Sequence, residues 1–223
     1  MNTMKNYSVL LVICALILLA GCKKNPDPDF HFDYFGLEEG RYVVYDVVDI
    51  THDDALNQHD TVEYQLKTYW AGEYIDDQGR TAREFWRYTR DSITGAWEFK
   101  DIWTGIIDGI RAELIEENQR RIKLVFAPTL QKLWDANAYN MQPVLECYYR
   151  NIHQDTLING TNFESTVVVE QDNFNSLIDT VRMYETYAKG VGLVSKYSKD
   201  IHFQYDSLVG WYLDKGNELY YNY

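Results

Sequence analysis

Basic residues are scarce in this chain. Its 223 residues include 21 lysines and arginines against 34 aspartates and glutamates, which gives a formal net charge of −13. A surface of that sign repels phosphate backbones and anionic lipid headgroups. The composition therefore argues against nucleic acid as a partner and against electrostatic docking on a membrane, and it also accords with the ordinary acidic surface of a soluble domain.

The short motifs that mark common catalytic and cofactor sites are missing. The sequence has no G-x-S-x-G, H-E-x-x-H, C-x-x-C or phosphate-binding P-loop. Gly190-Val191-Gly192 is only part of a dinucleotide fingerprint, and a hairpin turn explains it better. His52-Asp53-Asp54 with His59-Asp60 has metal-ligating residue types, but a solvated loop seldom gives a metal site its fixed geometry. We predict no cofactor, no metal and no enzymatic activity.

No apolar run is long enough to cross a bilayer. The longest, residues 9–20, has about a dozen residues, whereas a spanning helix needs about 20. Lys5 precedes it and Leu19-Ala20-Gly21-Cys22 ends it, which is typical of a secretory signal peptide, and that ending resembles the bacterial lipobox. We predict a lipoprotein signal peptide over residues 1–21 and a diacylglycerol thioether on Cys22.

The segment that follows Cys22 is polar and spaced by prolines, so we predict a flexible tether over residues 22–31. Residues 32–223 show no fixed-period repeat and no linker, which predicts a single β-rich domain. Several acyl chains hold a protein on a membrane far more firmly than one chain. Lys23 stands where an aspartate would mark inner-membrane retention, which favours the outer membrane and leaves the membrane face open.

Cysteine is rare, with only Cys14, Cys22 and Cys147 present. Cys14 leaves with the signal peptide and Cys22 carries lipid, so the mature chain keeps one free thiol and forms no internal disulfide. Cys147 lies in a strand-like stretch, which favours a buried small side chain over a reactive thiol.

Two-residue alternation of apolar and polar side chains dominates from Gly40 onward. Residues 61–71 place their apolar side chains on one face, and residues 41–50 are apolar on both faces, which predicts a central strand covered on both sides. Further strands are predicted at 81–90, 97–103, 112–116, 121–126, 144–153, 165–170, 177–188, 193–197 and 201–205. Residues 128–140 break the pattern and predict a long loop or a short helix. The fold class is therefore all-β, an antiparallel meander forming a strongly curved sheet or half-open barrel with few short helices.

Four landmarks stand out along the domain: Tyr34-Phe35-Gly36-Leu37, residues 40–47, Trp134-Asp135-Ala136-Asn137, and residues 187–194. Together they resemble a family of Bacteroidetes-type outer-membrane lipoproteins that has no established activity. This chain departs from the family pattern at Gly36, where proline is usual, at Val43 and at Ala136. The resemblance implies a lipid-anchored envelope protein, and by analogy a half-barrel like that of periplasmic lipoprotein carriers.

Aromatic residues are abundant at 15% of the chain, with 19 tyrosines and 6 tryptophans. Trp70, Trp86, Trp97 and Trp103 lie on neighbouring predicted strands and are candidates for lining one concavity. Their flat apolar faces and single polar handles suit sugars and amphiphiles, although aromatic side chains fill β cores equally well.

Aspartate followed by serine or threonine and then an apolar residue occurs five times, where composition predicts about one. The hydroxyl residues are Thr61, Ser92, Thr156, Thr180 and Ser207. The pattern resembles the O-glycosylation motif of exported Bacteroidetes-type proteins. Turn chemistry just before a strand explains it equally well, and both interpretations stay open.

These features predict a lipid-anchored envelope protein with a non-catalytic binding or accessory role, whose partner is an amphiphile, a glycan or an envelope protein. One alternative is a structural or assembly protein that uses its edge strands and the 128–140 loop. A less favoured alternative is a hydrolase of envelope polymers, because glycosidase chemistry needs only two suitably spaced carboxylates.

Overall fold

A computed structural model describes residues 28–91 and 95–223 of the chain. The predicted signal peptide, Cys22 and Ser92 lie outside the described residues. The strands are β1 (Tyr42–Asp53), β2 (Gln58–Ile75), β3 (Thr81–Arg90), β4 (Glu98–Asp108), β5 (Arg111–Glu116), β6 (Gln119–Val125), β7 (Leu133–Asp135), β8 (Glu146–Ile158), β9 (Thr161–Asn175), β10 (Asp179–Ala188), β11 (Gly192–Asp206) and β12 (Gly210–Asn222). Two 3₁₀ turns, η1 (Phe32–Tyr34) and η2 (Asp54–Leu56), are the only helical elements among the described residues.

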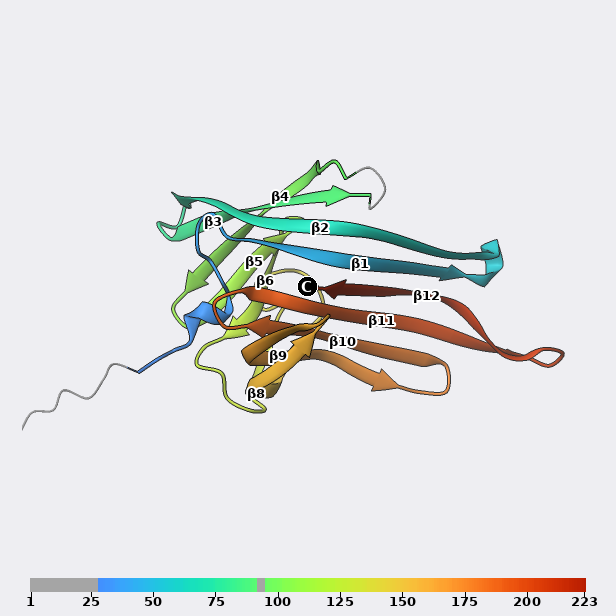
Figure 1. Cartoon of the computed structure of the whole chain (residues 1–223). Helices are drawn as coiled ribbons and strands as arrows, with labels where there is room; N and C mark the ends of the chain where they lie inside the picture. The colour runs from blue at the N-terminus through green and yellow to red at the C-terminus, as the bar shows by residue number, and fades with distance from the viewer. Residues whose placement is uncertain (1–27, 92–94) are drawn as a thin grey trace, which may run out of the picture.

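The twelve strands form one antiparallel sheet built from two six-stranded meanders. Strands β1 to β6 follow one another across one half, β7 to β12 follow one another across the other, and β1 pairs with β12 in the middle. The sheet curls strongly (Figure 1). Its edge strands β6 and β7 meet, and the amide of Ile122 donates to the carbonyl of Ala136 at 2.9 Å. The predicted antiparallel meander is therefore confirmed as a sheet nearly closed into a barrel.

Side chains complete the seam between β6 and β7. The Trp134 indole N–H donates to the carbonyl of Ile122 at 3.1 Å, and the Asn140 amide donates to the carbonyl of Arg120 at 2.9 Å. These bonds satisfy backbone carbonyls on an edge strand that the barrel partly buries. The segment 128–140, for which we predicted a loop or a short helix, is a loop that contains the three-residue strand β7.

The sequence missed one long strand and divided another. Predicted strands 193–197 and 201–205 are parts of the single strand β11, because the polar residues between them continue the sheet. Strand β12 was not predicted, since Gly216 interrupts its alternation. A Cβ at Gly216 would lie 2.3 Å from the carbonyl oxygen of Asp200, so the close approach of β11 requires glycine there.

The inner faces of the strands carry the core. In β1, Val43, Tyr45 and Val47 point inward and are buried, and in β2 Leu66 and Trp70 are buried beside them. The outer face of β1 is not covered, however, since Tyr42 is 62% exposed. The prediction that residues 41–50 are covered on both sides is therefore wrong for the outer face.

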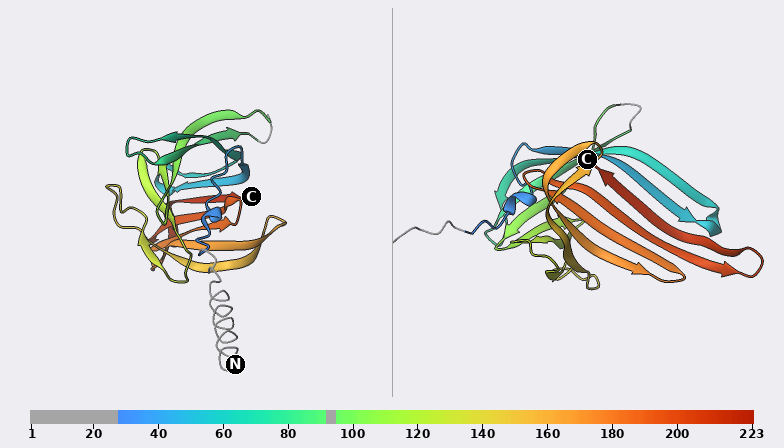
Figure 2. Two further views of the ribbon diagram at one scale, coloured as in Figure 1. Left: turned by 90° about the vertical axis from the view of Figure 1, so that its left-hand side faces the viewer. Right: turned by 60° about the horizontal axis from the view of Figure 1, so that its bottom comes forward.

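The N-terminal segment closes one end of the barrel. Tyr34, Phe35 and Leu37 are buried, and the Tyr34 hydroxyl lies 2.7 Å from both His153 Nδ1 and Ser165 Oγ. η1 lies across the ring of strands in the end-on view (Figure 2). We call residues 32–37 the plug.

The opposite end of the molecule is drawn out into long hairpins. The β1–β2 and β11–β12 hairpins extend well beyond the closed part of the barrel, on the side away from the plug (Figure 1). Nowhere in residues 28–91 or 95–223 is there a helix with the length and apolar character needed to cross a bilayer.

Gly36 should be the most demanding glycine in the plug. It has φ +63°, and a Cβ there would lie 2.6 Å from the Val191 carbonyl oxygen, whereas Gly79 has φ +76° with open space around it. Gly79→Ala should lose about 1 kcal/mol in free energy of unfolding from backbone strain alone. Gly36→Ala should lose about 3 kcal/mol, because steric overlap adds to the strain. Urea unfolding of the two variants measures the difference, and equal losses would contradict the tight docking of the plug.

Candidate functional site

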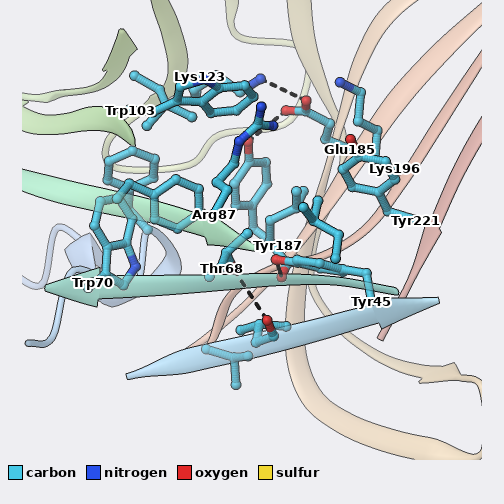
Figure 3. Close-up of a pocket in the computed structure, with 18 of the residues that line it drawn as sticks. Tyr45, Thr68, Trp70, Arg87, Trp103, Lys123, Glu185, Tyr187, Lys196 and Tyr221 are labelled. Carbon is cyan, nitrogen blue, oxygen red and sulfur yellow. Dashed lines mark hydrogen bonds and ion pairs between the residues drawn. The ribbon is translucent and has the colours of Figure 1, made fainter. Parts of the chain in front are cut away.

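The structure divides the four candidate tryptophans between two faces of the sheet. Trp70 and Trp103 point into the barrel and line an internal cavity (Figure 3). Trp86 points outward from β3, where it pairs in register with Tyr69 on β2. Trp97 lies over Lys67 on the same outer face. The expectation that all four line one concavity is corrected, because neighbouring positions along a strand alternate between faces.

The internal cavity has an aromatic wall and a charged wall. Its volume is about 60 Å³. Phe85, Tyr45, Tyr187 and Tyr221 join Trp70 and Trp103 on the aromatic side, and Arg87, Glu116, Lys123, Glu185 and Lys196 form the charged side. This space is smaller than the roughly 150 Å³ that holds benzene and far below the roughly 300–1,000 Å³ of typical ligand pockets. An acyl chain does not fit, but a few waters or a very small molecule does.

Lys123 is the centre of the charged wall. Its ammonium lies 2.7 Å from Glu185 Oε1 and 3.2 Å from Glu116 Oε1, and the Tyr187 hydroxyl donates to the other oxygen of Glu185 at 2.6 Å. Burial alone would raise the pKa of Glu185, but the charges of Lys123 and Lys196 outweigh burial and hold that pKa at about 2. Burial alone would lower the pKa of Lys123, and its two carboxylates raise it instead.

Sequence reasoning missed this charged wall. Lys123 alternates with Ile122 and Leu124, so simple alternation places it on the face away from them. The β5–β6 pairing shifts register beside it, between Ala112 and Glu113, and this irregularity brings Lys123 to the cavity. The inward position of Arg87 could have been predicted from the sequence, because Arg87 lies two residues after Phe85 and therefore shares the inward face of β3 with it.

The outer face of β1 to β4 carries aromatic side chains in two cross-strand rows, of which Tyr42 and Phe99 are exposed and the others half-buried. One row is Tyr42, Tyr69, Trp86 and Ile102, and the next is Val44, Lys67, Tyr88 and Phe99. The Lys67 ammonium lies 4.6 Å from the Tyr88 ring centre and 4.9 Å from the Trp97 ring centre. These cation–π contacts hold the rings in place on an open surface.

The far end of the β11–β12 hairpin stands apart from its neighbours. Pairing of β11 with β10 ends at His202, and pairing of β12 with β1 ends at Lys215. Within the described structure, residues 204–212 therefore pair only with one another, as a two-stranded hairpin end without a neighbouring strand on either side. We call residues 204–212 the free ribbon. It exposes Tyr205, Leu208, Val209 and Trp211, with Leu208 92% exposed.

Acidic side chains surround the free ribbon. The pairing of β1 with β12 ends at Asp53 opposite Lys215. At and beyond this pair, the strands and turns carry one lysine, Lys215, and five aspartates, which are Asp53, Asp54, Asp179, Asp206 and Asp214. The turn between β9 and β10 adds the exposed side chains of Leu177 and Ile178 beside this acidic surface. The far end is therefore both apolar and negative.

The histidine and aspartate cluster at 52–60 forms the β1–β2 turn. His52 and His59 face each other with their Nδ1 atoms 3.3 Å apart, and Asp53 accepts from the Leu56 amide at 3.1 Å. Within the described part of the chain, no group of three or more His, Cys, Asp or Glu side chains is arranged to hold a metal ion. Gly190-Val191-Gly192 lies at the β10–β11 turn, against the plug.

The candidate glycosylation residues occupy different local structures. Thr61 lies exposed within β2, and Thr156 lies within β8 with its hydroxyl 2.7 Å from that of Thr166. Thr180 follows the start of β10 and donates to Asn175 at 3.2 Å. Turn chemistry before a strand does not describe Thr61 or Thr156, because both lie inside strands.

Ser207 follows the turn interpretation instead. The Asp206 carboxylate before it accepts from the amides of Leu208 and Val209 at 2.7 and 3.2 Å, which is an aspartate-stabilised turn. Glycosylation itself stays a prediction at all five positions.

Cys147 is buried beside the seam. Its side chain is 1% exposed and its thiol lies 3.7 Å from the Leu145 carbonyl oxygen, which confirms the expectation of a buried small side chain. Burial raises the pKa of Cys147 to about 12.

Neither a protein-family model nor a curated protein matches the chain. The resemblance to Bacteroidetes-type lipoproteins stays a prediction.

Glu185 should give the protein a strong dependence of stability on acid. Its pKa is about 2 in the folded state against an ordinary 4.5, so its contribution is complete above about pH 4.5 and is lost as the pH falls toward 2. The shift corresponds to about 3 kcal/mol. Urea unfolding of Glu185→Gln between pH 2 and 6 should show a shallower loss of stability with acid than the unsubstituted protein. Glu164→Gln, which removes an exposed carboxylate, is the control, and parallel curves for all three proteins would contradict the assignment.

Cys147 should react with thiol reagents only after unfolding. A pKa near 12 leaves so little thiolate at pH 8 that labelling should be slower by about a thousandfold than for an ordinary cysteine, and burial slows it further. The measurement uses mature protein with Cys22→Ser, labelled with and without urea and read by mass. Rapid labelling of Cys147 in the folded protein would show that the seam opens freely.

Proposed function

We propose that this chain is an outer-membrane, lipid-anchored envelope protein with a non-catalytic accessory role, and that its free ribbon binds a protein partner. The observation that carries the proposal is a two-stranded ribbon with exposed apolar side chains at the end of the molecule opposite the N-terminal plug. A tether that leaves beside the plug would hold the plug end toward the membrane and direct the ribbon away from it. The lipobox-like ending at Cys22 supports the anchor.

The ribbon favours a protein over a lipid surface. Its strand edges lack neighbouring strands in the described residues, and such edges offer backbone groups that can pair with another sheet. Leu208 and Trp211 provide apolar anchors of the kind that dominate protein interfaces. The surrounding aspartates repel anionic headgroups and complement a basic rim. The expected partner is therefore a protein with an apolar groove bordered by lysine or arginine.

The other candidates find less support in the geometry. An amphiphile inside the barrel is disfavoured by the cavity volume of about 60 Å³. An assembly role through the 128–140 loop is weakened because Trp134 and Asn140 of that loop already hold the seam.

A hydrolase of envelope polymers would need a carboxylic acid whose pKa is raised toward neutrality. Among the described residues, the carboxyl groups whose pKa values depart from the ordinary range all do so downward, and they are Asp29, Asp76, Glu185 and Glu218. These groups stay ionised at neutral pH and give the hydrolase alternative no support.

Photocrosslinking in intact cells of the native host tests the ribbon. A photoreactive phenylalanine analogue at Leu208 should yield a discrete crosslinked protein, whereas the same analogue at Met141, which is 99% exposed near the seam, should not. The second substitution Trp211→Ser should reduce the crosslink at position 208 at least about tenfold, since an interface anchor contributes 2 kcal/mol or more. High salt should weaken the same crosslink, because charge complementarity contributes to it.

Three outcomes would overturn the proposal. They are crosslinks at Leu208 that contain only lipid, crosslinks only to a second copy of this chain, and equal crosslinks at Leu208 and Met141. The anchor is tested separately: Cys22→Ser should release the protein from the membrane fraction and abolish palmitate incorporation, and an unchanged fractionation would remove the lipid-anchored part of the proposal.

A further inference from the structure

Three cations border the internal cavity, and two of them have carboxylate partners in the barrel. Arg87 binds Asp101 through two bonds of 2.6 and 2.5 Å, and its guanidinium stacks 3.3 Å from the centre of the Trp103 ring. Lys123 is shared between Glu185 and Glu116, as described above. Each of these two charges is therefore neutralised inside the barrel.

Lys196 is the third cation and lacks such a partner. No hydrogen bond or ion pair joins its ammonium to any residue among 28–91 and 95–223, and the centre of the Tyr221 ring lies 5.6 Å from Nζ. Its ammonium points toward the side of the cavity that carries Glu185 (Figure 3). Burial lowers the pKa of Lys196, and the charge of the Glu185 carboxylate opposes this effect only in part.

A second donor on the same cavity is also unsatisfied. The indole N–H of Trp103 is buried and has no hydrogen-bond partner in the described structure. Buried donors in proteins are nearly always paired, so the indole N–H of Trp103 indicates an acceptor that is supplied from outside the chain. The Lys196 ammonium borders the same cavity and could bind that acceptor too.

We propose that the barrel interior is a binding site for a short-chain monocarboxylate, with Lys196 as its counter-ion and the Trp103 indole as a further donor. A carboxylate would bring an acceptor within bonding distance of the Lys196 ammonium, and its two oxygens can accept from both donors. The aromatic wall of Trp70, Tyr45 and Tyr221 accommodates a methyl or ethyl group. The volume of about 60 Å³ limits the ligand to the size of acetate or propionate.

This inference does not rest on the proposed function, because it concerns a different part of the molecule. The ribbon variant Trp211→Ser should bind the carboxylate as the unsubstituted protein does. Failure of one proposal therefore leaves the other standing.

Titration of the purified mature protein with ¹³C-labelled acetate, followed by NMR, tests the site. Acetate should bind saturably, and acetamide, which has the same shape without the charge, should bind at least about tenfold more weakly, because hydrogen bonds to charged groups are the stronger ones. Hexanoate should not bind, since its chain exceeds the cavity. Trp103→Phe should weaken acetate binding by removing one donor while keeping an aromatic ring.

Lys196→Met is the decisive variant, and Lys199→Met is its control. Lys199 lies on the same strand and pairs with Glu218 at 3.3 Å outside the cavity. Lys196→Met should abolish acetate binding, while Lys199→Met should keep it within about twofold.

Folding of each variant is checked by circular dichroism, and Lys196→Gln replaces Lys196→Met if the latter does not fold. Unchanged acetate binding in the Lys196 variant, equal binding of acetate and acetamide, or no binding of acetate would each overturn the inference.

Discussion

The pairing of β1 with β12 is the contact on which the rest of the molecule depends. It runs from Asp46 opposite Asn222 to Asp53 opposite Lys215, and it joins two meanders whose other strand contacts are local in sequence. Bringing such distant segments together costs loop entropy, although that cost rises only slowly with length. Once formed, the pairing places both chain-terminal strands in the middle of the sheet and leaves β6 and β7 as the edges that meet at the seam.

Closure of the barrel decides where charge and apolar surface end up. Inside, it places Lys123, Glu185 and Lys196 beside an aromatic wall. There ion pairs stabilise the fold more than they would in water, and an unpaired donor destabilises it more. Outside, β11 and β12 run past their neighbours and leave Leu208 and Trp211 exposed on the free ribbon. The small interior and the projecting ribbon therefore favour different partners, a small carboxylate and a protein.

Alternation of side chains was enough to predict most strands, because each strand of a one-sided sheet keeps the same face inward over its whole length. The inward set of β2, with Leu66 and Trp70, follows this rule. It failed where geometry departs from regular pleating. Strand β12 was not predicted because Gly216 interrupts its alternation, and Lys123 was not expected in the barrel because the β5–β6 register shift turns it inward. The sequence singled out the four candidate tryptophans but did not predict that only Trp70 and Trp103 line the same cavity, since their positions along the strands did not settle which face each occupies.

An all-β meander, a buried Cys147 and a chain without common catalytic motifs could be predicted from the amino-acid sequence, because periodicity, burial preference and short motifs are local properties. The folded arrangement of the strands set the rest: Trp134 closes the seam, Gly36 admits the plug, and Lys196 forms no ion pair among the described residues while Lys123 forms two. These facts depend on which distant strands meet and at what register, and register follows from packing the whole sheet rather than from any one segment.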